Sequence, residues 1–204
     1  MKKYLQFALM IFCMSAIFTS CKDDDDSDDV AVEAYKLENE QAFAAKAKDP
    51  DFQKVSISGS GDDFIYRKII KEGSEPKIPI YYNSRVTVYY KGWLINSEDG
   101  EYFDKHEFED GAPAKFAVSS KASNAYTSGG VTYGVPAPIA GWTIALQNMN
   151  VGDKWEIWIP QTLGYGVNDY GSIPGYSTLV FEIEVIERTS EVAGTTDKED
   201  YPTS

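Results

Sequence analysis

Histidine and cysteine, which serve in many catalytic and metal-binding sites, are scarce in this 204-residue chain. His106 is the single histidine, and with two cysteines it leaves too few soft ligands for a structural zinc site. The sequence contains no phosphate-binding loop, no GxSxG nucleophile motif and no HExxH metal motif. Aromatic residues are plentiful instead, with 14 Tyr, 10 Phe and 4 Trp. This aromatic content argues against a wholly disordered chain.

A series of short motifs extends from residue 88 to residue 184. In chain order they are VYYKGWL at 88–94, DG at 99–100, FD at 103–104, IAGW at 139–142, MNVG at 149–152, LGYG at 163–166, IP at 173–174 and STLVFEIE at 177–184. Together, in this order and near this spacing, they resemble the FKBP-type peptidyl-prolyl isomerases. The resemblance covers about residues 62–188, the whole predicted globular core.

The resemblance assigns roles to individual residues. The positions that match the family's catalytic pocket are Tyr90, Phe103, Asp104, Ile139, Trp142, Tyr165 and Phe181. Trp142 would form the floor under the substrate proline, and Phe103 and Phe181 would form walls. The Ile139 N–H and the Tyr165 hydroxyl would hold substrate carbonyl oxygens, while Asp104 would order the polar edge with Tyr90. Phe116, Pro138 and Ile173 are expected to contact substrate, and neither a metal nor another cofactor is expected.

The implied activity is peptidyl-prolyl cis-trans isomerisation in exported polypeptides. One alternative is an FKBP-like chaperone or binding module with weak or no isomerase activity. A surface carbohydrate-binding β-sandwich is a further alternative, suggested by the tyrosine content, but the motifs argue against it. The net charge of −13 disfavours a nucleic-acid partner, because phosphate contacts need clustered Lys and Arg.

The chain departs from the family pattern at four places. Ala114 stands where a larger apolar residue is common, and Gly175 replaces the second proline of the IPP motif. Residues 107–110 are acidic apart from Phe108, so we expect Asp104 to lack an ion-pair partner. Residues 118–136 form an insertion that is interpreted as a lid, a client-binding loop or a segment without function.

Hydrophobic periodicity predicts the elements that position these residues. Alternation indicates strands at 64–70, 84–95, 115–118, 153–160 and 177–189, and helical spacing indicates a short helix at 141–149. This pattern alone fits an α+β domain or a β-sandwich. The resemblance favours α+β: a five-stranded antiparallel half-barrel wrapped around one short helix, within residues 62–189. An N-terminal helix at about 33–48 is expected inside a helix-and-linker segment, 33–61.

The two ends of the chain are expected to be disordered, and the first to carry targeting information. Residues 1–20 have a basic start, an apolar run from 5 to 18 and small residues before Cys21, which together predict an export signal. An export signal that ends at a cysteine, here Cys21, resembles a bacterial lipoprotein signal, and the resemblance implies that Cys21 is lipidated. Phe18 stands where such signals usually have Leu, and a soluble secretory signal is the alternative. Residues 21–32 are expected to be an extended acidic tether, resembling the surface-export signals of Bacteroidetes lipoproteins, and 190–204 a polar tail.

The expected location is the cell envelope. The lipid anchor at Cys21 is expected in the outer membrane, on its periplasmic or its exposed surface. The expected partners are proline-containing unfolded or exported polypeptides. The sequence leaves the oligomeric state open.

Overall fold

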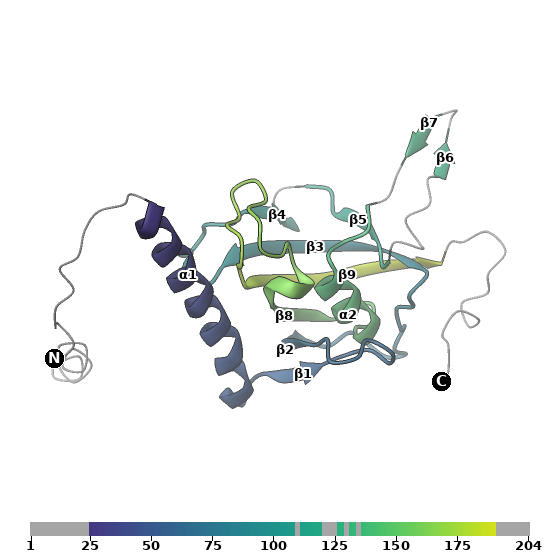
Figure 1. Ribbon diagram of the computed structural model, residues 1–204. Coiled ribbons are helices and arrows are strands. Elements are labelled where there is room, and N and C mark those ends of the chain that lie inside the picture. The colour runs from purple at the N-terminus through teal and green to yellow at the C-terminus, as the bar shows by residue number, and fades with distance from the viewer. Residues whose placement is uncertain (1–24, 109–110, 120–125, 129–130, 134–135, 191–204) are drawn as a thin grey trace, which may run out of the picture. The chain divides into compact units, whose positions relative to one another are not determined.

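The computed structural model describes residues 25–108, 111–119, 126–128, 131–133 and 136–190 (Figure 1). Residues up to Glu33 belong to one unit, and residues from Ala34 onward belong to another, which holds the sheet. The helices are α1 (Asp25–Ala45) and α2 (Ala140–Asn148), with 3₁₀ turns at Lys46–Lys48 and Gln161–Leu163. The strands are β1 (Gln53–Val55), β2 (Ile65–Lys71), β3 (Ser84–Leu94), β4 (Asp104–His106), β5 (Ala114–Ala117), β6 (Tyr126–Ser128), β7 (Val131–Tyr133), β8 (Lys154–Ile159) and β9 (Leu179–Ser190).

An antiparallel sheet in the order β1-β2-β8-β9-β3-β4 forms the framework. Strand β5 also pairs with β3, and it occupies the edge beside residues 85–88, while β4 occupies the same edge beside residues 90–92. The predicted strands are confirmed as β2, β3, β5, β8 and β9, with ends shifted by at most two residues. The short strands β1 and β4 were not predicted.

Alternating burial along the strands confirms the two-residue period that predicted them. In β8, Trp155, Ile157 and Ile159 are buried, and the residues between them are half-buried. In β9, every second residue from Leu179 to Val185 lies in the hydrophobic core. Because successive side chains of a strand point to opposite faces, one face of the sheet forms the core and the other meets solvent.

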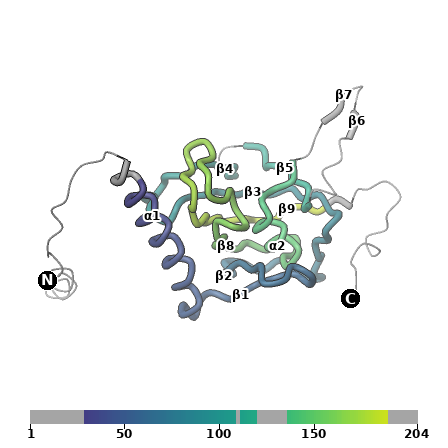
Figure 2. Tube along the Cα trace, in the orientation of Figure 1, coloured from purple at the N-terminus to yellow at the C-terminus, as the bar shows by residue number. Residues whose placement is uncertain are grey.

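Helix α2 covers the core face, as predicted (Figure 2). Trp142, Ile144, Ala145 and Leu146 are buried, and the helix contacts β1 and β2. A side chain at Gly141 would overlap the side chain of Ile159 on β8, so glycine at this position lets the helix lie close to the sheet.

Helix α1 begins earlier than its apolar pattern predicted. Its end agrees with the prediction, since the helix runs to Ala45 and a 3₁₀ turn continues to Lys48. The predicted extended tether is wrong for residues 25–32, which are helical. Acidic residues are favourable near a helix N-terminus, where the helix dipole places partial positive charge. No helix among the described residues is long and apolar enough to cross a membrane.

The predictions for the export signal, for Cys21 and for all but the first residue of the polar tail fall outside the described residues. Ser190, the first residue of that tail, is the last residue of β9.

Candidate active site

An aromatic cluster lies between α2 and the core face of the sheet, with Trp142 at its centre. The indole ring centroid lies 5.1 Å from that of Tyr90, 5.1 Å from that of Phe116 and 5.3 Å from that of Phe181. Phe103 packs edge-on against Phe181, with ring centroids 5.4 Å apart. Strands β3, β5 and β9 and the segment before β4 thus bring their rings to one helix, although these residues are far apart in the sequence.

Gly92 provides the space for two of these rings. It lies on β3 and pairs with Phe181 on β9 and with Asp104 on β4. A Cβ atom there would overlap Phe181 Cε1 and would come within 2.8 Å of Phe103 Cζ. The Phe103 N–H also donates to the Gly92 carbonyl at 2.9 Å. The glycine in the VYYKGWL motif therefore sets how closely Phe103 and Phe181 approach the strand.

Tyr90 and Asp104 form a polar edge beside the rings. The Tyr90 hydroxyl donates to Asp104 Oδ2 at 2.6 Å. Burial, the hydrogen bond to Asp104 and the charge of Asp104 raise the pKa of Tyr90 well above its ordinary value of 10. Tyr90 is therefore a neutral donor at physiological pH, and Asp104, for which we predicted no ion-pair partner, is held by this hydroxyl. His106 is exposed, and its ring centroid lies 5.5 Å from that of Tyr90.

Tyr165 lies at the same edge, on the loop after β8. Its ring stacks on that of Tyr170, with centroids 4.2 Å apart and planes 6° from parallel. Burial raises the pKa of Tyr165 above its ordinary value, and electrostatic interactions with Tyr170 and with the charge of Asp104 raise it further. Two neutral tyrosine hydroxyls and one carboxylate therefore belong to one rim of the aromatic cluster.

The remaining predicted residues lie at varying distances from the cluster. Ile139 caps α2, and its carbonyl accepts from the Trp142 N–H at 3.0 Å; its own N–H has no acceptor among the described residues. Ile173 is buried in the core, whereas Ile139, Ala114 and Phe116 are half-buried against it. Pro138 lines a different cavity, together with Tyr82, Ser119 and Leu163. The structure thus places Pro138 in the lining of this cavity, and none of the described rings of the aromatic cluster lines it.

The inserted segment contains a β-hairpin made of β6 and β7, in which Tyr126 pairs with Tyr133 and Ser128 with Val131. The prediction that this segment acts as a lid or client-binding loop depends on side chains that lie outside the described residues.

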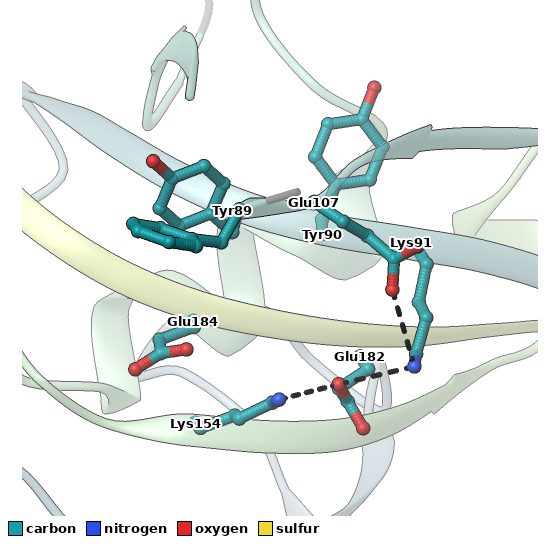
Figure 3. Close-up of a pocket in the computed structure, with 8 residues that line it drawn as sticks. Tyr89, Tyr90, Lys91, Glu107, Lys154, Glu182 and Glu184 are labelled. Atoms are coloured by element: carbon teal, nitrogen blue, oxygen red, sulfur yellow. Dashed lines mark ion pairs between the residues drawn. The ribbon is translucent and has the colours of Figure 1, made fainter. Parts of the chain in front are cut away.

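Sequence reasoning missed a groove on the opposite face of the sheet (Figure 3). It is lined by Tyr89, Tyr90, Lys91, Glu107, Phe108, Lys154, Glu182 and Glu184. Lys154 lies 2.7 Å from Glu182, and Lys91 lies 3.6 Å from Glu182 and 3.5 Å from Glu107. The alternation of charged residues with core residues in β9 is the signal that could have found it. Of the residues in the aromatic cluster, Tyr90 is the one that also lines this groove.

Comparison with known proteins identifies a family model, two curated relatives and a similar solved structure. The family model described as FKBP-type peptidyl-prolyl cis-trans isomerase matches residues 79–186. The chain is 38% identical over 159 residues to the FKBP-type 22 kDa peptidyl-prolyl cis-trans isomerase of Escherichia coli, covering 76% of this chain and 66% of that protein. It is 35% identical over 153 residues to the outer membrane protein MIP of Legionella longbeachae, covering 72% of this chain and 56% of that protein.

The fold is also similar to a crystal structure of a peptidyl-prolyl cis-trans isomerase from Pseudomonas syringae. The TM-score is 0.57 and the sequence identity 28%, and the match covers 84% of this chain and 99% of that one. The chain spans less than two thirds of the length of the two curated relatives described above.

Proposed function

Because the chain belongs to the family of FKBP-type peptidyl-prolyl cis-trans isomerases, we propose that it accelerates rotation about X–Pro bonds in the aromatic cluster around Trp142. The observation that carries the proposal is the enclosure of Trp142 by Tyr90, Phe116 and Phe181, beside the Tyr90–Asp104 hydrogen bond. A proline ring is apolar and compact, and an indole floor with aromatic walls is complementary to it.

The reaction needs no nucleophile, because no covalent bond is broken. The barrier is amide resonance, about 18–20 kcal/mol, and the uncatalysed event takes tens to hundreds of seconds. The twisted amide has less charge separation than the planar one, so an apolar pocket disfavours the planar ground state more. An acceleration of about 10⁵ requires only roughly 7 kcal/mol of differential stabilisation.

The roles proposed for the polar groups follow from their placement. Tyr165 lies at the rim as a neutral donor, and the Ile139 N–H has no acceptor among the described residues. Each is able to bind a carbonyl oxygen of the peptide on either side of the proline. Asp104 fixes the Tyr90 ring by accepting a hydrogen bond from its hydroxyl, which holds one wall against Trp142.

A peptide assay tests the isomerase proposal directly. The folded protein should accelerate cis-to-trans conversion of a short X–Pro peptide, and Trp142→Ala should lose most of that acceleration. Trp158→Ala is a matched control, since Trp158 lies on the other face of the sheet and packs against Phe52, with ring centroids 6.2 Å apart. Conversion at the background rate with the folded wild-type protein would contradict isomerase activity and favour a binding module or chaperone.

We also propose that the protein works in the cell envelope, anchored by lipid at Cys21, on exported polypeptides that contain proline. The support is the export-signal pattern of residues 1–20 and the likeness to an outer membrane protein of Legionella. Metabolic labelling with a fatty acid in a bacterial host tests the anchor. Label should enter the wild-type protein and be absent from Cys21→Ser, and equal labelling of both proteins would exclude lipidation at this residue.

A further inference from the structure

Asn39 is an unusual residue for a mostly exposed helix, because it is polar and fully buried, at 0% relative exposure. Its side chain makes two hydrogen bonds. The Oδ1 atom accepts from the Thr178 N–H at 2.7 Å, and the Nδ2 group donates to the Tyr35 carbonyl at 2.9 Å. The Asn39 carbonyl also accepts from the Thr178 hydroxyl at 3.0 Å. A buried polar side chain bonded in this way fixes the two segments it joins.

Tyr35, one turn earlier on the same face of α1, reinforces this attachment. Its hydroxyl lies 2.8 Å from Ser177 Oγ, which also donates to the Pro174 carbonyl at 2.7 Å. The Lys36 ammonium lies 5.6 Å from the ring centroid of Tyr176. Residues 35–39 of α1 therefore contact three consecutive residues, 176–178, immediately before β9.

The 176–178 segment is connected to the pocket on both sides. On one side, the Tyr176 N–H donates to the Gly166 carbonyl at 2.9 Å, next to Tyr165. On the other side, β9 begins at Leu179 and carries Phe181 into the aromatic cluster. Tyr176 itself has φ of 65°, a conformation that is unfavourable for a residue other than glycine and needs support from its surroundings.

From these contacts we propose that Tyr35 and Asn39 are positioning residues for the isomerase pocket. Helix α1 fixes residues 176–178, and through them it fixes Tyr165 and Phe181 in the arrangement that binds the peptide. This inference rests on the proposed isomerase function, and it extends the active unit from the family's matched region, residues 79–186, into the N-terminal helix.

The kinetic consequence is specific. Tyr165 would bind a carbonyl that flanks the reacting bond, and this contact is the same in the planar and the twisted amide. Loosening it weakens substrate and transition state alike, which raises KM and leaves kcat nearly unchanged. We expect Asn39→Ala, which leaves the buried Thr178 N–H without its acceptor, to raise KM about fivefold to tenfold. Tyr35→Phe should raise KM by a smaller factor, because Ser177 keeps its bond to Pro174.

Two control variants on the same helix separate positioning from general stability. Glu40→Ala alters an exposed neighbour of Asn39 and should match the wild-type protein. Phe43→Leu loosens α1 where it packs against Phe64 and Tyr66, away from residues 176–178. It should lower the unfolding free energy without raising KM. A rise in KM for Phe43→Leu equal to that for Asn39→Ala would overturn the proposal, as would an unchanged KM in Asn39→Ala.

A second measurement remains decisive if the protein shows no isomerase activity. Hydrogen exchange of the Tyr176 and Thr178 amides should be faster in Asn39→Ala than in Phe43→Leu, when the two variants are compared at equal unfolding free energy. If the wild-type protein does not accelerate X–Pro rotation, the proposed function fails, and these exchange rates still decide whether α1 holds the segment. Equal exchange in the two variants would refute the positioning role.

Discussion

Gly92→Ala tests whether Phe103 and Phe181 form the walls of the reacting site. The added Cβ would overlap Phe181 Cε1 and lie 2.7 Å from Phe181 Cδ1 and 2.8 Å from Phe103 Cζ. Because optimal carbon–carbon contacts are about 3.5–4.0 Å, Phe103 would have to move by roughly 0.7 Å and Phe181 by roughly 1 Å. Since a displacement of about 1 Å in groups that position a substrate costs about 10²-fold, kcat/KM should fall about tenfold to a hundredfold.

The measurement is kcat/KM in the peptide assay, together with the unfolding free energy from urea titration. The variant should lose about 1–3 kcal/mol of stability through overpacking and should remain folded. Gly73→Ala is a matched control, because its Cβ would overlap the Val151 carbonyl, away from the aromatic cluster. It should lose stability but keep kcat/KM within about twofold, as expected for a distant, independent site. Wild-type kcat/KM in folded Gly92→Ala, or an equal loss in Gly73→Ala, would refute this account of the pocket.

Three further predictions concern the cluster and its polar edge. Phe103→Ala should lose most turnover in the peptide assay and His106→Ala little, because His106 is exposed; equal losses would show that the pocket is misassigned. Tyr90→Phe keeps the ring but removes the donor to Asp104, so we expect kcat/KM to fall by about tenfold, the equivalent of roughly 1.4 kcal/mol. Because the pKa of Tyr90 is higher in the folded protein than in the unfolded chain, the neutral hydroxyl contributes fully to stability below about pH 10. Above that pH the unfolded chain releases the Tyr90 proton while the folded protein keeps it, so this contribution is progressively lost. Urea titrations above about pH 10 should show a decline in stability that is shallower in Tyr90→Phe, by up to about 1.4 kcal/mol per pH unit, because Tyr165 still contributes a decline of its own.

The elements that sequence reasoning missed are those whose structure comes from their neighbours. Strand β4 consists of Asp104, Lys105 and His106, which are all exposed, so no apolar alternation marks it. It is a strand because β3 offers an unpaired edge beside residues 90–92. Strand β1 likewise buries only Val55 and depends on pairing with β2. Such short polar strands carry no periodic signal of their own.

The start of α1 was also missed because its first residues carry no apolar pattern. Its first residues are acidic and were interpreted as a solvated tether, whereas the helix begins at Asp25. An amphipathic pattern locates only the part of a helix that packs, here the part around Phe43, which meets Phe64 and Tyr66. Helical residues that pack on nothing leave no such pattern.

The sequence by itself determined the long strands, the short helix and the identity of the aromatic residues. Apolar spacing reports which residues must be buried, and the motif order carried the family resemblance. Tertiary structure alone decided which of those residues meet. Tyr90 and Asp104 are 14 positions apart and Asn39 and Thr178 are 139 apart, yet each pair shares a short hydrogen bond. Such bonds depend on strand register and on the docking of a helix, which arise from packing across the whole domain and leave no periodicity along the chain.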